Sequence, residues 1–120
     1  MMKISFDFDS TLSEPQFQEL AKIFLAIDGI EVFVVTSRLR DAYPIHDNRD
    51  LFKVTDGLGI ARDNVFFTEG RTKAQLLDKL EIDYHFDDME DEIDLINNSI
   101  GCHGILVGFK LSNIGYLLNQ

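Results

Sequence analysis

Short apolar runs alternate with segments of helical periodicity along the chain. The runs predict β-strands over residues 3–8, 31–36, 64–68, 83–86 and 104–109. The segments between them predict a first helix between Ser13 and Gly29, helices over residues 48–58, 72–80 and 89–100, and a short closing helix over 114–118. Strands that alternate with helices are typical of an α/β fold with a doubly wound, five-stranded parallel sheet. We therefore expect a three-layer, Rossmann-like domain.

Two of the predicted helices begin with the spacing of a capping box. Ser13 is followed by Gln16, and this helix then carries an apolar face made of Phe17, Leu20, Ala21, Phe24 and Leu25. Thr72 is followed by Gln75, which places Lys73 in the first turn of its helix. The helix dipole disfavours a cation there, so we expect an anion such as phosphate beside Lys73. A plain surface lysine is the alternative.

The composition predicts a single domain over residues 1–120. Hydrophobic residues make up 45% of the chain and include 10 Phe, which is enough for one core. The 21 acidic and 11 basic residues give a net charge of -10, which disfavours binding to extended nucleic acid or to an anionic membrane. The single cysteine, Cys102, can form no intramolecular disulfide, and no stretch approaches the ~20 apolar residues of a membrane span. We expect a soluble, cytoplasmic protein.

Polar side chains follow the predicted strands or open the helix behind them. In chain order they are Asp7, Asp9 and Thr11; Thr36, Ser37 and Arg38; Lys73; and Asp87, Asp88 and Asp91. Ligands of open parallel sheets bind just beyond the carboxyl ends of the strands. We therefore expect these hydroxyl, cationic and carboxylate groups to meet at one edge of the sheet.

The acidic residues among them predict a metal site. Asp7 and Asp9 end an apolar strand, where two carboxylates are costly to bury and repel each other. The stretch DDMEDEID adds six acids at residues 87–94. A cation would let these groups coexist, and oxygen ligands of this kind suit Mg²⁺. Because acids are favoured in the first turn of a helix, a solvated face is an equally good interpretation of Glu90, Glu92 and Asp94.

This ordered set resembles the four motifs of the haloacid dehalogenase superfamily of aspartyl phosphotransferases. The matching stretches are DFDST (7–11), VVT followed by SR (34–38), Lys73 within RTKAQLL, and FDDMED (86–91). The flanking strands and helices extend the resemblance to nearly the whole chain. Position 10 is Ser where the family often has Gly, and the chain has no room for a cap domain. Capless members tend to act on large substrates or to oligomerise, so a homo-oligomer is one expectation.

The resemblance implies catalytic roles for four residues. Asp7 would be the nucleophile that forms an aspartyl-phosphate. Asp9 would protonate the leaving oxygen and then activate water. Thr36 would hold the transferring phosphoryl group, and Lys73 would balance the charge of Asp7 and phosphate.

Binding roles follow from the same resemblance. The expected Mg²⁺ ligands are Asp7, the backbone carbonyl of Asp9, Asp87 and Asp88, with Asp91 acting through water. Two adjacent acids and an Asp-x-x-x-Asp pair are both family patterns, so the choice between Asp87 and Asp88 as the direct ligand stays open. Further contacts to phosphate are expected from Thr11, Ser37 and Arg38.

These features predict a Mg²⁺-dependent phosphate monoester hydrolase whose substrate is a small molecule. The alternatives are a nucleotidase or nucleic-acid 3'-end phosphatase of the same superfamily, or a non-catalytic domain that binds a metal or a partner. A response-regulator receiver domain is disfavoured, because its phosphoacceptor Asp should follow the third strand, which here ends in Thr68-Glu69-Gly70.

The remaining polar positions are weaker candidates. The loop over residues 37–47 is expected beside the pocket, where Arg40, Tyr43 or His46 would contact substrate, although a solvated loop explains each of them equally well. His85 and His103 are predicted to be strand residues rather than ligands, and Cys102 a small buried residue.

Overall fold

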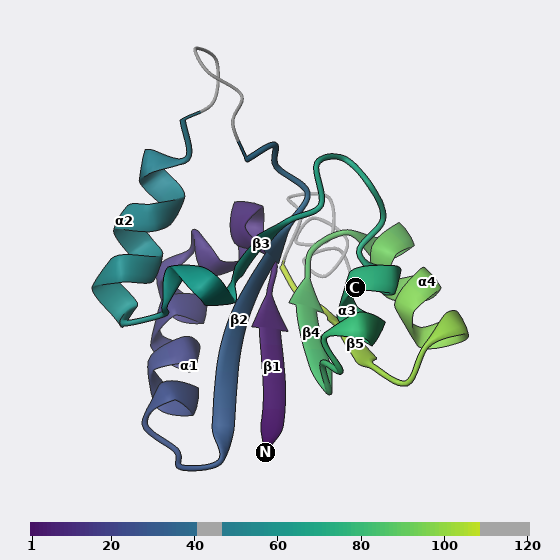
Figure 1. Cartoon of the computed structure of the whole chain (residues 1–120), viewed down its shortest axis with the longest axis horizontal. Coiled ribbons are helices and arrows are strands. Elements are labelled where there is room, and N and C mark those ends of the chain that lie inside the picture. The colour runs from purple at the N-terminus through teal and green to yellow at the C-terminus, as the bar shows by residue number, and fades with distance from the viewer. Residues whose placement is uncertain (41–46, 109–120) are drawn as a thin grey trace, which may run out of the picture.

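Five strands form one all-parallel sheet in the order β3-β2-β1-β4-β5 (Figure 1). The computed structural model describes residues 1–40 and 47–108. Its strands are β1 (Met2–Phe6), β2 (Ile30–Thr36), β3 (Val65–Phe67), β4 (Tyr84–Asp87) and β5 (His103–Leu106). Its helices are α1 (Pro15–Leu25), α2 (Arg49–Leu58), α3 (Ala74–Lys79) and α4 (Glu90–Ser99), with single turns η1 (Phe8–Leu12) and η2 (Arg62–Asn64). The α/β class and the parallel sheet are as predicted.

The strand order reverses beside β1. The chain moves from β1 to β2 and β3 on one side, then returns to place β4 and β5 on the other. Both β2 and β4 are hydrogen-bonded to β1 in parallel. Because crevices at the carboxyl ends of parallel strands form where the order reverses, the ends of β1 and β4 are the expected place for a site.

Helices cover both faces of the sheet, which is compatible with a Rossmann-like, three-layer fold. In Figure 1, α1 and α2 lie on one side of the strands, and α3 and α4 lie on the other. The first side holds a cluster of buried residues that includes Phe6, Val34 and Leu51. The second holds a smaller cluster that includes Leu77 and Ile96, together with Cys102, which is buried as predicted. Each helix is therefore stabilised by burial of one of its faces against the sheet.

The two faces of the central strand pair β1 and β4 differ in chemistry. Phe6 and Phe86 face α1 and stack with their ring centroids 5.0 Å apart. Successive side chains of a strand point to opposite faces, so the residues before them lie on the α3 and α4 side. These are Ser5 and His85, which are partners in the parallel register and are both fully buried. The centre of the sheet is thus apolar on one face and polar on the other.

The first strand and the first helix are shorter than predicted. The strand predicted for residues 3–8 ends at Phe6, and the helix predicted to begin at Ser13 begins at Pro15. Proline suits the first turn of a helix, where its missing N–H is not needed. The capping box was wrong, because the Ser13 hydroxyl instead accepts a hydrogen bond of 3.0 Å from the Ser10 N–H in the preceding turn.

Differences at the other elements are small. The third helix begins at Ala74 with Lys73, not Thr72, at its N-cap and without a side-chain cap, so the second capping box was wrong as well. The Glu92 carboxylate accepts the Lys73 N–H at 3.1 Å. The fifth strand covers His103–Leu106 instead of residues 104–109. The second and fourth helices agree with the prediction to within about one residue at each end, which is the usual uncertainty of such boundaries. The predicted helix over 114–118 lies outside the described residues.

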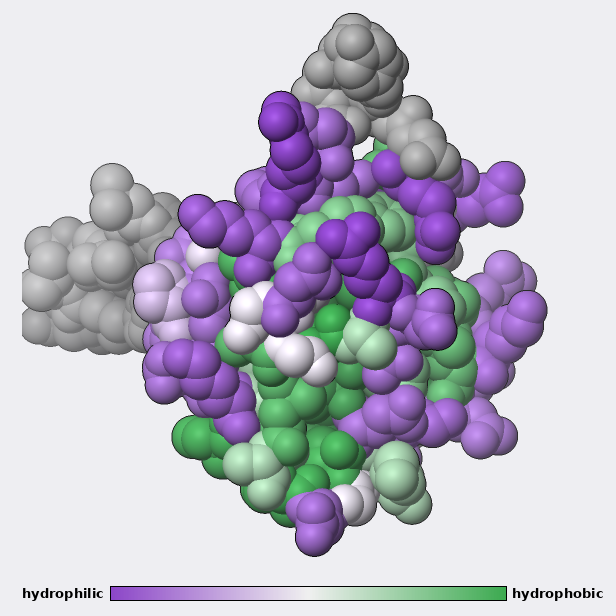
Figure 2. All heavy atoms as spheres, turned by 60° about the vertical axis from the view of Figure 1, so that its left-hand side comes forward, coloured by the Kyte–Doolittle hydropathy of each residue, from purple (hydrophilic) through white to green (hydrophobic). Residues whose placement is uncertain are grey.

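The surface mixes apolar and polar side chains. Figure 2 turns the side with α1 and α2 toward the viewer and shows apolar area between polar groups. Ile23 in α1 and Ile27 just after it are 59% and 46% exposed. Among residues 1–40 and 47–108, no helix combines the length and the apolar composition needed to cross a membrane.

The contact between α4 and β5 leaves little room for a side chain at position 104. A Cβ there would lie 3.0 Å from Cδ1 of Ile93. Gly104→Ala should therefore lower the free energy of unfolding by about 1–3 kcal/mol, measured by urea denaturation. Gly57→Ala in α2 is the matched control: its Cβ would meet nothing within 4 Å, and Ala should raise helix stability by about 0.5–1 kcal/mol. Equal responses of the two variants would contradict the packing of α4 on β5.

Candidate functional site

Three aspartates meet where β1 and β4 end. Asp7 directly follows β1, Asp87 is the last residue of β4, and Asp88 comes next. Each offers a carboxylate oxygen, and these oxygens all lie within 4.8 Å of one another. The pairing of β1 with β4 brings them together, since the Asp7 N–H still donates to the carbonyl of Phe86 at 2.8 Å. Three converging carboxylates are hard oxygen ligands of the kind that Mg²⁺ prefers, so the donor set fits the predicted ion.

A buried lysine lies beside two of these aspartates. Lys73 is only 1% exposed, and its Nζ lies 3.0 Å from Oδ1 of Asp7 and 2.5 Å from Oδ2 of Asp87. A buried ammonium needs such partners, because removing its charge from water is otherwise costly. The alternative of a surface lysine was wrong. The anions beside Lys73 are the two carboxylates, and its contact with phosphate stays a prediction.

Asp87 is held from three directions. Its Oδ2 accepts hydrogen bonds from Lys73 and, at 2.8 Å, from Nε2 of His85. Its Oδ1 accepts the N–H of Met89 at 3.0 Å. His85 in turn lies 2.6 Å from the Ser5 hydroxyl through Nδ1. Because the carboxylate can only accept, His85 carries its proton on Nε2, and the Ser5 hydroxyl donates to Nδ1.

Burial and neighbouring charges separate the titration of the two strand-end acids. Burial raises the pKa of Asp7 to about 7, against the charge of Lys73 and with the help of the negative charge of Asp87. Burial acts upward on the pKa of Asp87 as well, but the hydrogen bond from His85 and the charge of Lys73 bring it down to about 2. Burial also lowers the pKa of His85, which is therefore neutral at pH 7. Asp87 is thus the firmly ionised partner of Lys73.

Asp9 is turned away from this group and toward Arg38. The guanidinium donates from Nε to one oxygen of Asp9 at 2.9 Å and from Nη2 to the other at 2.7 Å. It also bonds to both oxygens of Asp50 in α2, at 2.8 and 2.9 Å, and lies over the ring of Phe8. The side chain of Asp9 is not part of the three-aspartate group. Its predicted metal contact runs through its backbone carbonyl, and that contact stays a prediction, as does the binding of phosphate by Arg38.

The predicted hydroxyl ligands have different surroundings. Thr11 is fully buried in η1, and its hydroxyl is the one buried polar side-chain atom without a hydrogen-bond partner among residues 1–40 and 47–108. Thr36 is buried at the end of β2, where its hydroxyl accepts the N–H of Arg38 at 3.3 Å. Ser37 is exposed, and its carbonyl accepts the N–H of Gly70 at 2.8 Å, which ties the loops after β2 and β3 together.

The later acids of the run divide into two kinds. Glu92 bonds to the backbone of Lys73, so it links α4 to the start of α3 and is more than a solvated acid. Asp91 and Asp94 are exposed on α4. A water-mediated contact of Asp91 with a metal stays a prediction.

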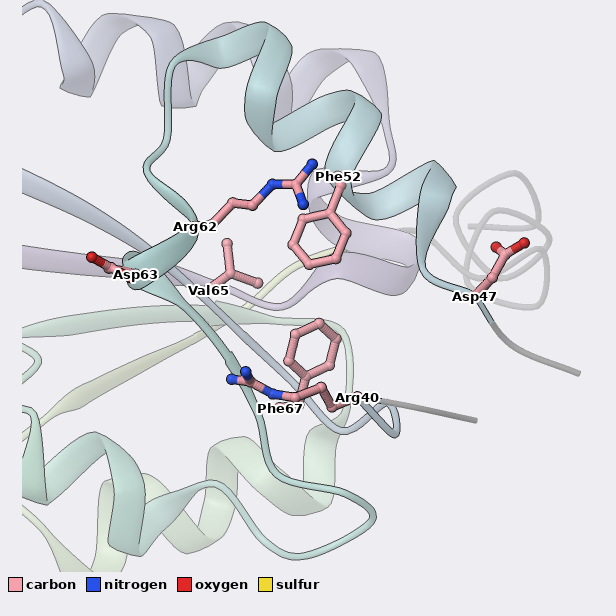
Figure 3. Close-up of a pocket in the computed structure, with 7 residues that line it drawn as sticks. All are labelled: Arg40, Asp47, Phe52, Arg62, Asp63, Val65 and Phe67. Atoms are coloured by element: carbon pink, nitrogen blue, oxygen red, sulfur yellow. The ribbon is translucent and has the colours of Figure 1, made fainter. Parts of the chain in front are cut away.

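A separate pocket of about 380 Å³ lies beside the edge strand β3 (Figure 3). Its lining consists of Arg40, Asp47, Phe52, Arg62, Asp63, Val65 and Phe67. The Arg40 guanidinium lies over the Phe67 ring, and that of Arg62 lies over the Phe52 ring. None of the three site aspartates lines it. Of the predicted loop contacts only Arg40 can be placed here, since Tyr43 and His46 lie outside the described residues.

Three residues that hold the site in place were missed. No sequence pattern assigned a role to Ser5 or Asp50, and His85 was predicted only to be a strand residue. A signal for Ser5 and His85 does exist in the sequence: SFD at residues 5–7 and HFD at 85–87 are matching polar-Phe-Asp triplets at two strand ends. Strands that pair in register place such triplets side by side. Asp50 could not be found in this way, because its contact depends on where α2 lies.

No protein-family model matches the chain, and a search of curated proteins returned no match.

The raised pKa of Asp7 predicts a pH dependence of stability without metal. Folded Asp7 keeps its proton up to about pH 7, whereas unfolded Asp loses it near 3.8. The folded state thus binds more protons between these values, so the free energy of unfolding contributed by Asp7 falls as the pH rises toward 8. We expect a loss on the order of 2 kcal/mol between pH 5 and pH 8, measured by urea denaturation with a chelator present.

Asp7→Asn should remove most of this loss, because an amide cannot ionise. Asp94→Asn, on the exposed face of α4, should keep the wild-type slope and controls for a general change in net charge. A wild-type protein that is equally stable at pH 5 and pH 8, or an Asp7→Asn variant with an unchanged slope, would show that Asp7 is not held in its neutral form.

Proposed function

We propose that this protein is a Mg²⁺-dependent phosphate monoester hydrolase of the haloacid dehalogenase type that works through an aspartyl-phosphate on Asp7. The observation that carries the proposal is the grouping of Asp7, Asp87 and Asp88 around buried Lys73 at the point where the strand order reverses. A nucleophilic carboxylate, a fixed cation and further oxygen ligands are what phosphoryl transfer requires.

Asp7 supplies the nucleophile in the first step. One of its oxygens faces Lys73, and the other attacks phosphorus while the bond to the leaving oxygen breaks. Asp9 gives a proton to that oxygen. In the second step Asp9 takes a proton from water, the water oxygen attacks phosphorus, and the bond to Asp7 breaks to release inorganic phosphate. Since Arg38 bonds to both oxygens of Asp9, at least one of these contacts must open before Asp9 reaches the substrate.

The carboxylates Asp7, Asp87 and Asp88 would hold Mg²⁺, which when bound neutralises negative charge on the phosphoryl oxygens. Asp88 is the better candidate for the direct ligand. Asp87 already accepts three hydrogen bonds from Lys73, His85 and Met89, whereas Asp88 is partly exposed. Lys73 would balance part of the charge that gathers on Asp7 and on phosphate.

A small phosphate ester is the substrate class that the composition favours. The net charge of -10 opposes a long contact with a polynucleotide. Thr11 supports a polar occupant beside η1, because its buried hydroxyl is left without a partner in the described part of the chain. The proposed phosphate contacts are those of Thr11, Thr36 and the residues that follow β2.

Turnover tests the proposal directly. Purified protein should release phosphate from a generic aryl phosphate when Mg²⁺ is present and not when it is chelated. Asp7→Asn should abolish release, because an amide is a poor nucleophile. Asp94→Asn should keep wild-type rates. If a broad panel of phosphate monoesters gives no release above the Asp7→Asn background, the proposal fails and the non-catalytic interpretation takes its place.

Mg²⁺ should also stabilise the folded protein. An ion that binds only the folded state at tenfold excess over its Kd adds ~1.4 kcal/mol. For a domain of this size that is a melting shift of roughly 3 to 7 °C. Asp88→Asn should reduce the shift and raise the melting point without metal, because it removes one of the repelling charges.

The melting experiment needs two controls. Ionic strength is matched with a monovalent salt, since screening alone relieves repulsion. Asp94→Asn should leave both the Mg²⁺ shift and the metal-free melting point near the wild-type values. If Asp88→Asn and Asp94→Asn respond alike, the acidic run is a general charge patch and the metal does not bind at the strand end.

A further inference from the structure

A chain of hydrogen bonds runs from the interior of the sheet to the proposed nucleophile. The Ser5 hydroxyl lies 2.6 Å from Nδ1 of His85, and Nε2 of His85 lies 2.8 Å from Oδ2 of Asp87. Oδ2 of Asp87 lies 2.5 Å from Nζ of Lys73, which lies 3.0 Å from Oδ1 of Asp7. Two of these groups, Ser5 and His85, have no part in the proposed reaction.

We propose that His85 is a positioning residue for this site: it fixes the Asp87 carboxylate so that Lys73 is shared between Asp87 and Asp7. This inference rests on the proposed function for its effect on turnover. Its effect on the arrangement of the three aspartates does not require turnover.

The residues Ser5, His85 and Asp87 have the composition of a hydrolytic triad but not its geometry. In such a triad Nε2 of the histidine faces the serine, and Nδ1 faces the carboxylate. Here the two nitrogens are exchanged, since Nδ1 faces Ser5 and Nε2 faces Asp87. Ser5 and His85 are also each 0% exposed, so no substrate reaches the hydroxyl. The group therefore supports the site and does not act as a second one.

His85 affects Lys73 because both donate hydrogen bonds to the same oxygen of Asp87. A carboxylate oxygen has two lone pairs, and Oδ2 of Asp87 accepts from both His85 and Lys73. With His85 in place, Lys73 can occupy only one side of that oxygen and extends to Asp7. Without His85, this oxygen of a fully buried carboxylate keeps Lys73 as its donor and loses the other, which should draw the ammonium toward Asp87 and away from Asp7. Asp7 would then lose part of its cation, and the three-aspartate group would lose its arrangement.

Two amide variants separate the two contacts of the ring. In His85→Gln the amide nitrogen stands near the place of Nε2, so the donor to Asp87 is kept and the contact with Ser5 is lost. In His85→Asn the amide stands near the place of Nδ1, so the contact with Ser5 is kept and the donor to Asp87 is lost. Both side chains are neutral and polar. Asn leaves the larger gap at this fully buried position, so the free energy of unfolding of both variants is compared with their Mg²⁺ affinities.

The test measures Mg²⁺ affinity by calorimetry and steady-state kinetics on an aryl phosphate, with circular dichroism to confirm folding. Loss of a residue that orients a metal ligand costs about 10- to 100-fold in metal affinity or activity. We expect His85→Asn to lose this much in Mg²⁺ affinity and in kcat, with KM changed less. His85→Gln should stay within a few-fold of wild type. Equal losses in two folded variants, or none in His85→Asn, would overturn the role of His85.

The two readouts keep this inference apart from the proposed function. A wild-type protein that binds Mg²⁺ but hydrolyses no ester overturns the proposed function, and the affinities of the two variants still decide the role of His85. A wild-type protein that binds no Mg²⁺ overturns both. If His85→Asn does not fold, Ser5→Ala replaces it: loss of the hydrogen bond that holds the ring should weaken Mg²⁺ binding by about 2- to 10-fold. An unchanged affinity would count against the proposal.

Discussion

The contact of buried Lys73 with Asp7 and Asp87 is the interaction on which the rest of the site depends. Two carboxylates at the ends of adjacent strands would repel each other out of the protein interior, and the ammonium allows both to stay there. One positive charge does not balance the three carboxylates of the group, which includes Asp88. Burial, with the help of the negative charge of Asp87, raises the pKa of Asp7. The excess of negative charge favours a cation at the strand end. The same lysine thus holds the acids together and leaves their negative charge only partly balanced.

The period of two along a strand builds the core and the site from the same residues. On one face of β1 and β4, the stacked pair Phe6 and Phe86 belongs to the core beneath α1. On the other face, Ser5 and His85 continue into the aspartates that follow them. A slip of one residue in the register would place the aromatic rings under α3 and the polar groups in the apolar cluster. The register is therefore specified most strongly at the strands that carry the candidate site.

The sequence predicted what depends on local pattern and missed what depends on contacts between distant segments. The order of strands and helices follows from periodicity, and the place of Asp7 and Asp87 follows from the rule for parallel strand ends. The capping box at Ser13 did not form, because the helix begins at Pro15 and the Ser13 hydroxyl bonds to the preceding turn. The pairing of Arg38 with Asp9 and Asp50 was missed, since nothing near position 38 tells where α2 will lie.

Because Arg38 pairs with both Asp9 and Asp50, the stretch DFDST does not determine the positions of its two aspartates by itself. Asp7 owes its position to the strand it follows, so any chain with that strand pair would keep it. Asp9, only two residues on, owes its position to a guanidinium anchored on a helix that begins 40 residues later. If residues 7–11 were transplanted onto another sheet with the same strand pair, Asp7 would keep its position, whereas Asp9 would lose its pairing with Arg38. Asp7 and Asp9 thus depend on different contacts of the fold, so a substitution can disturb the position of one without disturbing the other.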